Sequence, residues 1–298
     1  MAKITMEMIK ELREKTQVGM MECKKALIDA DGNIEKAIEI LRKKGADVAA
    51  KRADKATNNG HVESCISQDL KTGTLLKTSC ETDFSANTVD MKEFAQRICK
   101  HILKTHPTCT HDDDAACLLQ QKLFDDEKIT INDLLNELVA KIGEKINIEE
   151  FASLQVEGNG LISSYIHPGA NLGVLVQIST NKPLDQNTEK VKQLAHDICM
   201  QIAVTNPLSI NPDGLNTDIL EKELEIVKAQ LAASNKPESI IEKIADGKMR
   251  KFYEEVCLLN QKFIKDDKTT IQNQIDKVSK ETGLQIQVKQ YKRFSIGK

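Results

Sequence analysis

The chain has 298 residues, of which 40% are hydrophobic and 29% charged, and its formal net charge at pH 7 is −3. This length allows two or three domains, and the composition is that of an ordinary globular protein. The slightly acidic balance argues against a global basic field for nucleic acid, and the low aromatic content, 3% without Trp, disfavours base-stacking platforms. No apolar run approaches the ~20 residues that cross a bilayer, and the N-terminus opens into a helical pattern rather than a signal core. We therefore expect a cytoplasmic protein with no membrane or nucleic-acid partner.

Eight cysteines are scattered through apolar or helical segments, and no two of them have the C-x-x-C spacing of a zinc or redox site. We expect free, mostly buried thiols, and no bound metal or cofactor. The eight are Cys23, Cys65, Cys80, Cys99, Cys109, Cys117, Cys199 and Cys257.

Residues 1–55 carry the pattern of three short helices. Thr5 is suited to cap the first helix and Asn33 the third, while Gly45 is suited to end the third helix as its C-terminal cap. Three helices in so few residues predict a small bundle with a thin core, a common type of recognition module. The segment 46–59 is rich in Ala, Lys and Asp, so we expect a helical or partly flexible linker with a solvated face.

A second part, residues 56–145, is predicted to be an α+β subdomain. Alternating strand patterns at 61–67 and 73–78 are followed by amphipathic helix patterns at 89–104 and 131–142.

A polar corner, residues 80–85 (CETDFS), joins the second of these strands to the first helix. In an extended segment, Asp83 and Phe84 point in opposite directions and could contact two different groups at once. The simplest structural interpretation is that Asp83 caps the next helix and Phe84 is a core residue. The alternative is a contact site in which a carboxylate and a large aromatic act together.

The loop at residues 106–114 holds two His, one Cys and three Asp, which suggests a metal site. Its spacing matches no zinc template, and three adjacent carboxylates are common in a solvated turn or at a helix start. We favour the solvated loop.

The third part, residues 146–298, is predicted to be a second α+β subdomain. Strand patterns at 146–156, 161–166 and 172–179 indicate an antiparallel meander. A helix, a projecting helical hairpin at about 213–246, two further helices and a closing strand at 284–294 follow. The seam of the hairpin is expected to consist of Leu220, Leu224, Val227 and Leu231. The strand and helix order echoes the second part, so the predicted fold class is α+β with two related subdomains.

The common enzyme motifs are missing from the sequence. It contains no G-x-x-x-x-G-K-[ST], no G-x-G-x-x-G, no H-E-x-x-H and no G-x-S-x-G, and its six His have no obvious paired nucleophile. A binding or regulatory protein is therefore favoured over an enzyme.

Six short motifs occur along nearly the whole chain. They are residues 16–27 (TQVGMMECKKAL), 80–84 (CETDF), 141–148 (KIGEKINI), 173–176 (GVLV), 247–252 (GKMRKF) and 293–294 (RF). These motifs resemble those of the bacterial elongation factor Ts family, in the family's order. Each motif is weak alone, but the ordered set is highly specific.

The resemblance implies a guanine nucleotide exchange factor for elongation factor Tu, with a ubiquitin-associated-type bundle and a coiled-coil arm. In this family the Asp-Phe corner is wedged beside the nucleotide's magnesium site on the partner, and the factor itself binds no nucleotide. By position, the residues that displace magnesium are Thr82, Asp83, Phe84 and Ser85. Weaker candidates for partner contact are Leu12, Met20, Met21 and Lys24 in the bundle, and Tyr165 and His167 beside the strand loop.

Two other classes of function stay open. One is a ubiquitin-type or helix-binding adaptor that uses only the first bundle. The other is a cysteine- or metal-dependent enzyme that uses the loop at 106–114.

Overall fold

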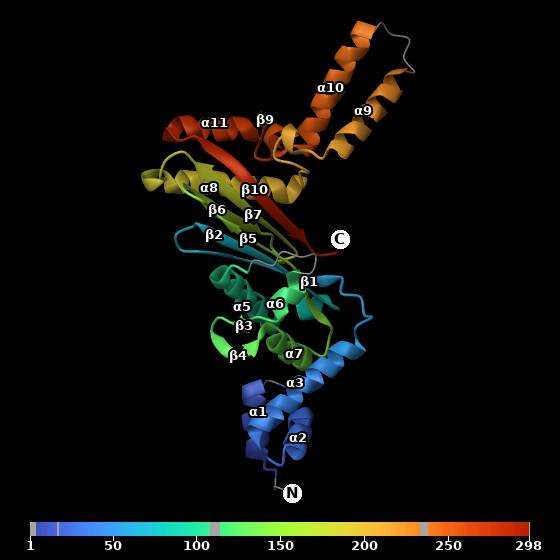
Figure 1. The fold of residues 1–298 in the computed structure, drawn as a ribbon, viewed down its shortest axis with the longest axis vertical. Helices are drawn as coiled ribbons and strands as arrows, with labels where there is room; N and C mark the ends of the chain where they lie inside the picture. The colour runs from blue at the N-terminus through green and yellow to red at the C-terminus, as the bar shows by residue number, and fades with distance from the viewer. Residues whose placement is uncertain (1–3, 17, 108–113, 233–237, 298) are drawn as a thin grey trace.

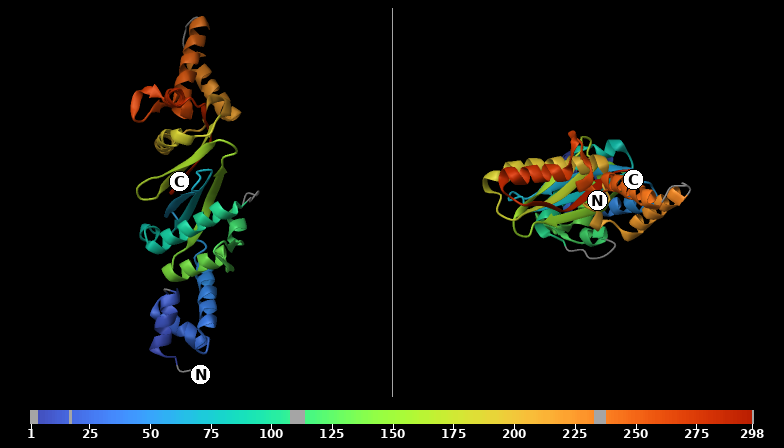
Figure 2. Two further views of the ribbon diagram at one scale, coloured as in Figure 1. Left: turned by 90° about the vertical axis from the view of Figure 1, so that its left-hand side faces the viewer. Right: turned by 90° about the horizontal axis from the view of Figure 1, so that it is seen from above.

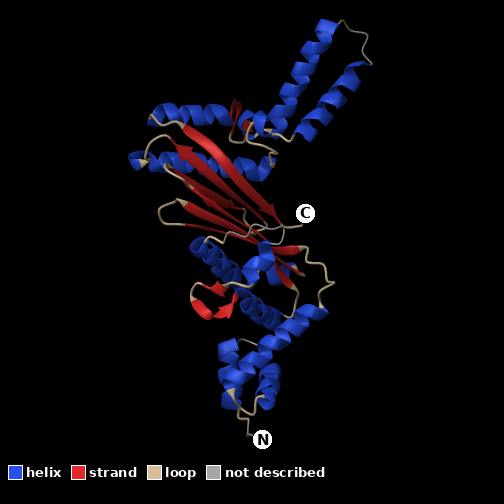
Figure 3. Cartoon of the chain, viewed as in Figure 1, coloured by secondary structure: helices blue, strands red, loops and turns tan. Residues whose placement is uncertain are grey.

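The computed structural model describes residues 4–16, 18–107, 114–232 and 238–297. Helices and antiparallel sheets are mixed, which confirms the α+β class (Figure 3). The molecule is elongated: the N-terminal helices lie at one end, two sheets lie in the middle, and a pair of long helices projects at the other end (Figure 1). Within the described part of the chain, no helix is both long and apolar enough to span a membrane.

The N-terminal bundle consists of α1 (Met6–Thr16), α2 (Met20–Asp29) and α3 (Ile34–Lys51). Thr5 Oγ1 accepts the Met8 N–H at 3.3 Å, and Asn33 Oδ1 accepts the Lys36 N–H at 3.0 Å, so both predicted caps are confirmed. The buried faces of the three helices form one small core. It contains Ile9, Leu12, Val18, Cys23, Ala26, Leu27, Ala30, Ala37 and Leu41.

The prediction that Gly45 ends the third helix is wrong. Helix α3 continues through Gly45 to Lys51 and packs on α7 (Ile131–Ile142). A Cβ atom on Gly45 would lie 2.1 Å from the carbonyl oxygen of Asn136. The glycine is needed because only a residue without a side chain lets the two helix backbones approach so closely.

The first α+β half consists of a three-stranded sheet covered by helices, in the strand order β1-β2-β5. Helix α5 packs on β1 and β2, and α7 packs on α5. The elements are β1 (Asn59–Ile66), β2 (Thr72–Cys80), α4 (Asp83–Ala86), α5 (Val89–Thr105), α6 (Asp114–Leu119), β3 (Lys122–Leu123), β4 (Asp126–Thr130), α7 and β5 (Ile146–Gln155).

The second half repeats this plan with the strand order β10-β7-β6, and α8 packs on β6 and β7. Its insertion is the helical hairpin. The elements are β6 (Gly160–Ile166), β7 (Leu172–Thr180), η1 (Asp185–Asn187), α8 (Thr188–Thr205), η2 (Pro212–Gly214), α9 (Thr217–Ala232), α10 (Glu238–Val256), η3 (Leu258–Asn260), β8 (Lys262–Phe263), β9 (Asp266–Thr270), α11 (Ile271–Thr282) and β10 (Ile286–Ser295).

The predicted meander of three consecutive strands from residue 146 is wrong. Strand β5 pairs with β2 of the first sheet, with Ile146 opposite Cys80, while β6 pairs with β7. The chain leaves the first sheet at Gly158 and Gly160, whose positive φ angles of 81° and 139° suit only glycine. The divisions expected at residues 55/56 and 145/146 stay predictions, although this pairing favours a border near Gly158.

The two sheets pack back to back through their inner faces, with α5 and α8 on the two outer faces (Figure 2). The cross-sheet contacts come in matching pairs. Val62 donates its N–H to the Ala170 carbonyl at 2.7 Å, Ile162 donates to the Leu70 carbonyl at 2.7 Å, and the hydroxyls of Ser64 and Ser164 lie 3.0 Å apart. The halves are therefore related by an approximate twofold axis, with an offset of 100 residues in this region.

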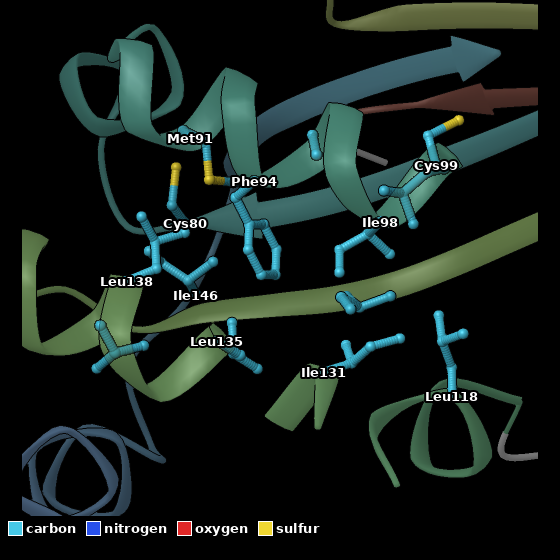
Figure 4. Close-up of a cluster of buried hydrophobic side chains, with 14 of the residues drawn as sticks. Cys80, Met91, Phe94, Ile98, Cys99, Leu118, Ile131, Leu135, Leu138 and Ile146 are labelled. Carbon is cyan, nitrogen blue, oxygen red and sulfur yellow. The ribbon is translucent and has the colours of Figure 1, made fainter. Parts of the chain in front are cut away.

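The core of the first half lies between its sheet, α5 and α7 (Figure 4). Its buried side chains include Cys80, Met91, Phe94, Ile98, Leu135, Leu138 and Ile146. His101 is a fully buried polar residue of this half: its Nδ1 accepts the Phe124 N–H at 3.2 Å, and its Nε2 lies 2.9 Å from the Gln121 side-chain oxygen. The matching residue of the second half, Gln201, accepts the Ile264 N–H at 2.9 Å and donates to Gln261 at 3.1 Å.

The projecting hairpin is made of α9 and α10, and its seam includes the predicted Leu220, Leu224 and Val227. The side chain of Leu231 lies outside the described part. Helix α10 runs unbroken through Gly247 and packs Met249 against the seam.

Replacing Gly45 by Ala is expected to destabilise the protein by about 1–3 kcal/mol, because the added Cβ cannot fit against the Asn136 carbonyl. Gly247→Ala is the matched control, since nothing lies within 4 Å of a Cβ there. That change in the middle of a helix should stabilise by roughly 0.5–1 kcal/mol. Urea unfolding followed by circular dichroism compares the two, and equal effects would contradict the role given to Gly45.

His101→Gln is expected to change the free energy of unfolding by less than about 1 kcal/mol, because glutamine supplies the same donor and acceptor at Gln201. His101→Leu should cost about 1–3 kcal/mol, because the partly buried hydrogen bond from the Phe124 N–H would lose its acceptor. Urea unfolding of both variants measures the two changes in unfolding free energy. A Gln variant as unstable as the Leu variant would refute the equivalence of His and Gln at this position.

Candidate functional site

The corner between β2 and α5 is a single helical turn, α4, rather than the extended segment that was expected. Thr82 caps this turn by accepting the Ser85 N–H at 3.3 Å, and Thr88 caps α5 by accepting the Met91 N–H at 3.2 Å. The interpretation of Asp83 as the helix cap is therefore wrong. So is the interpretation of Phe84 as a core residue, because 83% of its surface is exposed.

The turn is held in place by its buried residues and by hydrogen bonds to Glu144. Cys80, Ser85 and Ala86 are buried, while Asp83 and Phe84 are exposed. Glu144, in the turn after α7, accepts the Thr82 N–H at 3.1 Å and the Thr82 hydroxyl at 2.8 Å. An acidic and an aromatic side chain are thus held outward on a rigid base.

Glu81 ties the corner to two other segments. Its carboxylate receives the Arg52 Nε and Nη2 at 2.6 and 2.7 Å, and the Lys145 backbone N–H at 2.7 Å. The side chain is only 13% exposed. The hydrogen bonds from Arg52 and then from Lys145 lower the pKa of Glu81 to about 2.

The exposure of Phe84 is not required by the fold. At the matching corner of the second half, Leu184 packs partly buried against that half's core. Phe84 is instead exposed, and so is Val89 at the start of α5, which is 68% exposed. Large apolar side chains that are left exposed by the fold are informative about partner contact.

The bundle residues named from the sequence lie in different environments. Met21 is 65% exposed and Lys24 is exposed on the outer face of α2, whereas Met20 is half-buried. Leu12 is fully buried in the bundle core, so it supports the bundle and offers no surface to a partner in this conformation.

Tyr165 and His167 lie at the end of β6, in the second half. The Tyr165 hydroxyl is 3.1 Å from His167 Nδ1, and the ring of His196 on α8 packs edge-on against Tyr165 with centroids 5.8 Å apart. His196 was missed by the sequence reasoning because it lies in an ordinary helical pattern.

Arg52, Glu144 and Lys145 were also missed as supports of the corner. Arg52 was interpreted as part of a solvated face, and residues 144 and 145 fell within a motif, KIGEKINI, to which no role was given. Only the folded chain brings these three residues to Glu81 and Thr82, over separations of 29 to 64 residues.

The structure adds little support for the alternative function of a cysteine- or metal-dependent enzyme. Most of the loop at 106–114 lies outside the described residues, and within the described ones no group of three or more potential metal ligands gathers. Burial raises the pKa of Cys80 to about 11 and that of Cys199 to about 12, so both thiols stay protonated at neutral pH. Among the described residues six cysteines are free, but Cys117 is disulfide-bonded, which corrects the expectation for that residue.

Glu81→Gln is expected to flatten the dependence of stability on pH in acid. A carboxylate whose pKa falls on folding stabilises the fold above its unfolded pKa of 4.5, and this contribution is lost as the pH falls from there to about 2. The unfolding free energy of the parent should thus drop more steeply between pH 5 and pH 2.5 than that of the variant. Urea titrations at several pH values measure both slopes, and parallel slopes would contradict the pKa shift.

Comparison with known proteins agrees with the resemblance drawn from the motifs. The family model described as "Elongation factor TS" matches residues 81–298. The elongation factor Ts of Clostridium botulinum strain ATCC 19397 / Type A is 40% identical over 294 residues, covering 99% of this chain and 92% of the relative. That of strain Alaska E43 / Type E3 is also 40% identical over 294 residues, covering 99% and 93%. The chain therefore belongs to the elongation factor Ts family.

Proposed function

We propose that the protein acts in translation elongation, in the cytoplasm, as a guanine nucleotide exchange factor for elongation factor Tu. It promotes GDP release by displacing Mg²⁺ from the partner and by stabilising the nucleotide-free partner. The observation that carries this proposal is the Asp83–Phe84 pair, which is held outward on a capped and anchored turn. In this role the protein makes and breaks no covalent bond, so it is not an enzyme and needs no cofactor.

The two exposed corner residues are suited to different tasks. Phe84, inserted into an apolar crevice of the partner, would gain about 1.5–3 kcal/mol from burial. Asp83, one position away on the same turn, would compete for the groups that order the water shell of magnesium. Thr82 and Ser85 act indirectly, because Thr82 caps the turn and Ser85 is buried beneath it.

The remaining proposed contacts extend along the molecule. Met21 and Lys24 present an apolar side chain and a cation on α2, and Met20 contributes its exposed part. Tyr165 and His167 provide a further polar and aromatic contact at the other sheet. Leu12 contributes only by supporting the bundle.

The thermodynamics of exchange require no contact with GDP. Since the partner binds GDP largely through its phosphates and magnesium, a factor that disturbs the magnesium site weakens GDP. Linkage requires GDP to weaken the binding of the factor by the same ratio. Each tenfold loss of GDP affinity takes about 1.4 kcal/mol of this coupling, so burial of Phe84 alone would account for one to two powers of ten.

Phe84→Ala is expected to reduce the saturating rate of GDP release from elongation factor Tu by at least about tenfold, because the apolar insertion is lost. Asp83→Ala should reduce it as well. Release of a fluorescent GDP at fixed magnesium measures the rate while the protein is titrated in. The control is Leu208→Ala, which removes an exposed apolar side chain of the second half and should accelerate GDP release from elongation factor Tu as much as the parent does. A Phe84→Ala variant that is folded and fully active would refute the role of the corner.

A further inference from the structure

The approximate twofold axis provides an internal comparison for Glu81. In the second half, Asn181 occupies the matching position, and its side-chain oxygen accepts the Gln285 N–H at 2.9 Å. In the first half, the Glu81 carboxylate accepts the Lys145 N–H at 2.7 Å in the same way. The fold therefore needs only an acceptor at this position, and a neutral amide supplies it. The charge of Glu81 must serve something that the second half lacks.

The Glu81 carboxylate also binds the side chain of Arg52, the residue that directly follows α3. Its guanidinium binds both oxygens of Glu81, the geometry that gives an arginine–carboxylate pair its directional strength. The Lys145 ammonium adds two more bonds to the same segment, to the carbonyls of Ala53 and Lys55. The chain leaving the bundle is thus fastened to the base of the corner from two sides.

Helix α3 connects this contact to the N-terminal bundle. One end of α3 belongs to the bundle core through Ala37 and Leu41, its middle packs on α7 at Gly45, and its far end leads to Arg52. The bundle and the corner are therefore joined by one helix, and Arg52 fixes the end of that helix to Glu81 at the base of the corner.

We propose that the Arg52–Glu81 ion pair, supported by Lys145, is a positioning device that sets the bundle and the Asp83–Phe84 corner at the spacing needed to contact one partner molecule simultaneously. This inference rests on the proposed function, and it assigns Arg52 a role that the exchange chemistry itself does not require. Two contact surfaces in a fixed relation bind as a bivalent unit, because the second contact forms at a high effective concentration. When the link is broken, each surface stays intact but the two no longer match the partner together.

The test separates affinity from the saturating rate. GDP release from elongation factor Tu is measured against concentration of the full-length protein, for the parent, Arg52→Met, Arg52→Lys and Glu81→Gln. Arg52→Met should raise the half-maximal concentration about tenfold and leave the saturating rate within about twofold. Glu81→Gln keeps an acceptor for Lys145 and should act like Arg52→Met, the double variant should add little, and Arg52→Lys should be intermediate.

Arg97→Met is the matched control. It breaks a similar two-point pair, between Arg97 on α5 and Asp125, without touching the segment after α3. Its half-maximal concentration should be that of the parent. An unchanged half-maximal concentration in Arg52→Met, or an equal rise in Arg97→Met, would overturn the positioning role.

A second measurement needs no partner, so it distinguishes failure of this inference from failure of the proposed function. In Arg52→Met, amide hydrogen exchange should become faster across residues 46–58, while β2 keeps the protection of the parent. Unchanged hydrogen exchange in this segment would overturn the link, even if the parent accelerates GDP release from elongation factor Tu as proposed. A parent that does not accelerate this release would refute the proposed function, and the partner-matching role assigned to Arg52 would be refuted with it.

Discussion

The close approach of the two sheets is the constraint on which the rest of the structure depends. A Cβ atom on Gly73 would lie 2.4 Å from Ile162, and one on Gly173 would lie 2.6 Å from Val62. Matching hydrogen bonds from Val62 and Ile162 join the sheets at the same place. Because each sheet covers the inner face of the other, every helix of the two halves is left to the outer faces or the ends. The bundle and the hairpin consequently lie at opposite ends of a long molecule (Figure 1).

The repeated halves separate what the fold needs from what the fold merely permits. His101 and Gln201 meet the same buried donor and acceptor requirement with different chemistry. Phe84 and Leu184 occupy matching positions but lie in different environments, because Phe84 is exposed and Leu184 is packed against the core. Glu81 and Asn181 share one backbone contact, but only Glu81 is bound by an arginine. The additional exposure and charge occur at one corner of the first half, which is why we propose that corner as the functional surface.

Much of the fold could be predicted from local patterns. The caps at Thr5 and Asn33, the seam at Leu220, Leu224 and Val227, and the α+β class depend on residues close in sequence, and all are confirmed.

The errors arise where distant segments decide the outcome. Gly45 looks like a helix end until α7 packs against it, and the strand beginning at Ile146 looks like the start of a meander until it pairs with β2. The corner shows the same limit. The motif CETDF located it, but the exposure of Phe84 and the supporting contacts from Arg52 and Glu144 exist only once the chain has folded.

The central claim is that the protein and GDP bind elongation factor Tu in competition through the magnesium site. Isothermal titration calorimetry of the protein into nucleotide-free partner, and into partner saturated with GDP and magnesium, tests it most directly. The account predicts much tighter binding to the nucleotide-free form, by the same ratio with which the protein weakens GDP. Equal affinity for the two forms would contradict it, because a ligand without preference between two states cannot shift their equilibrium.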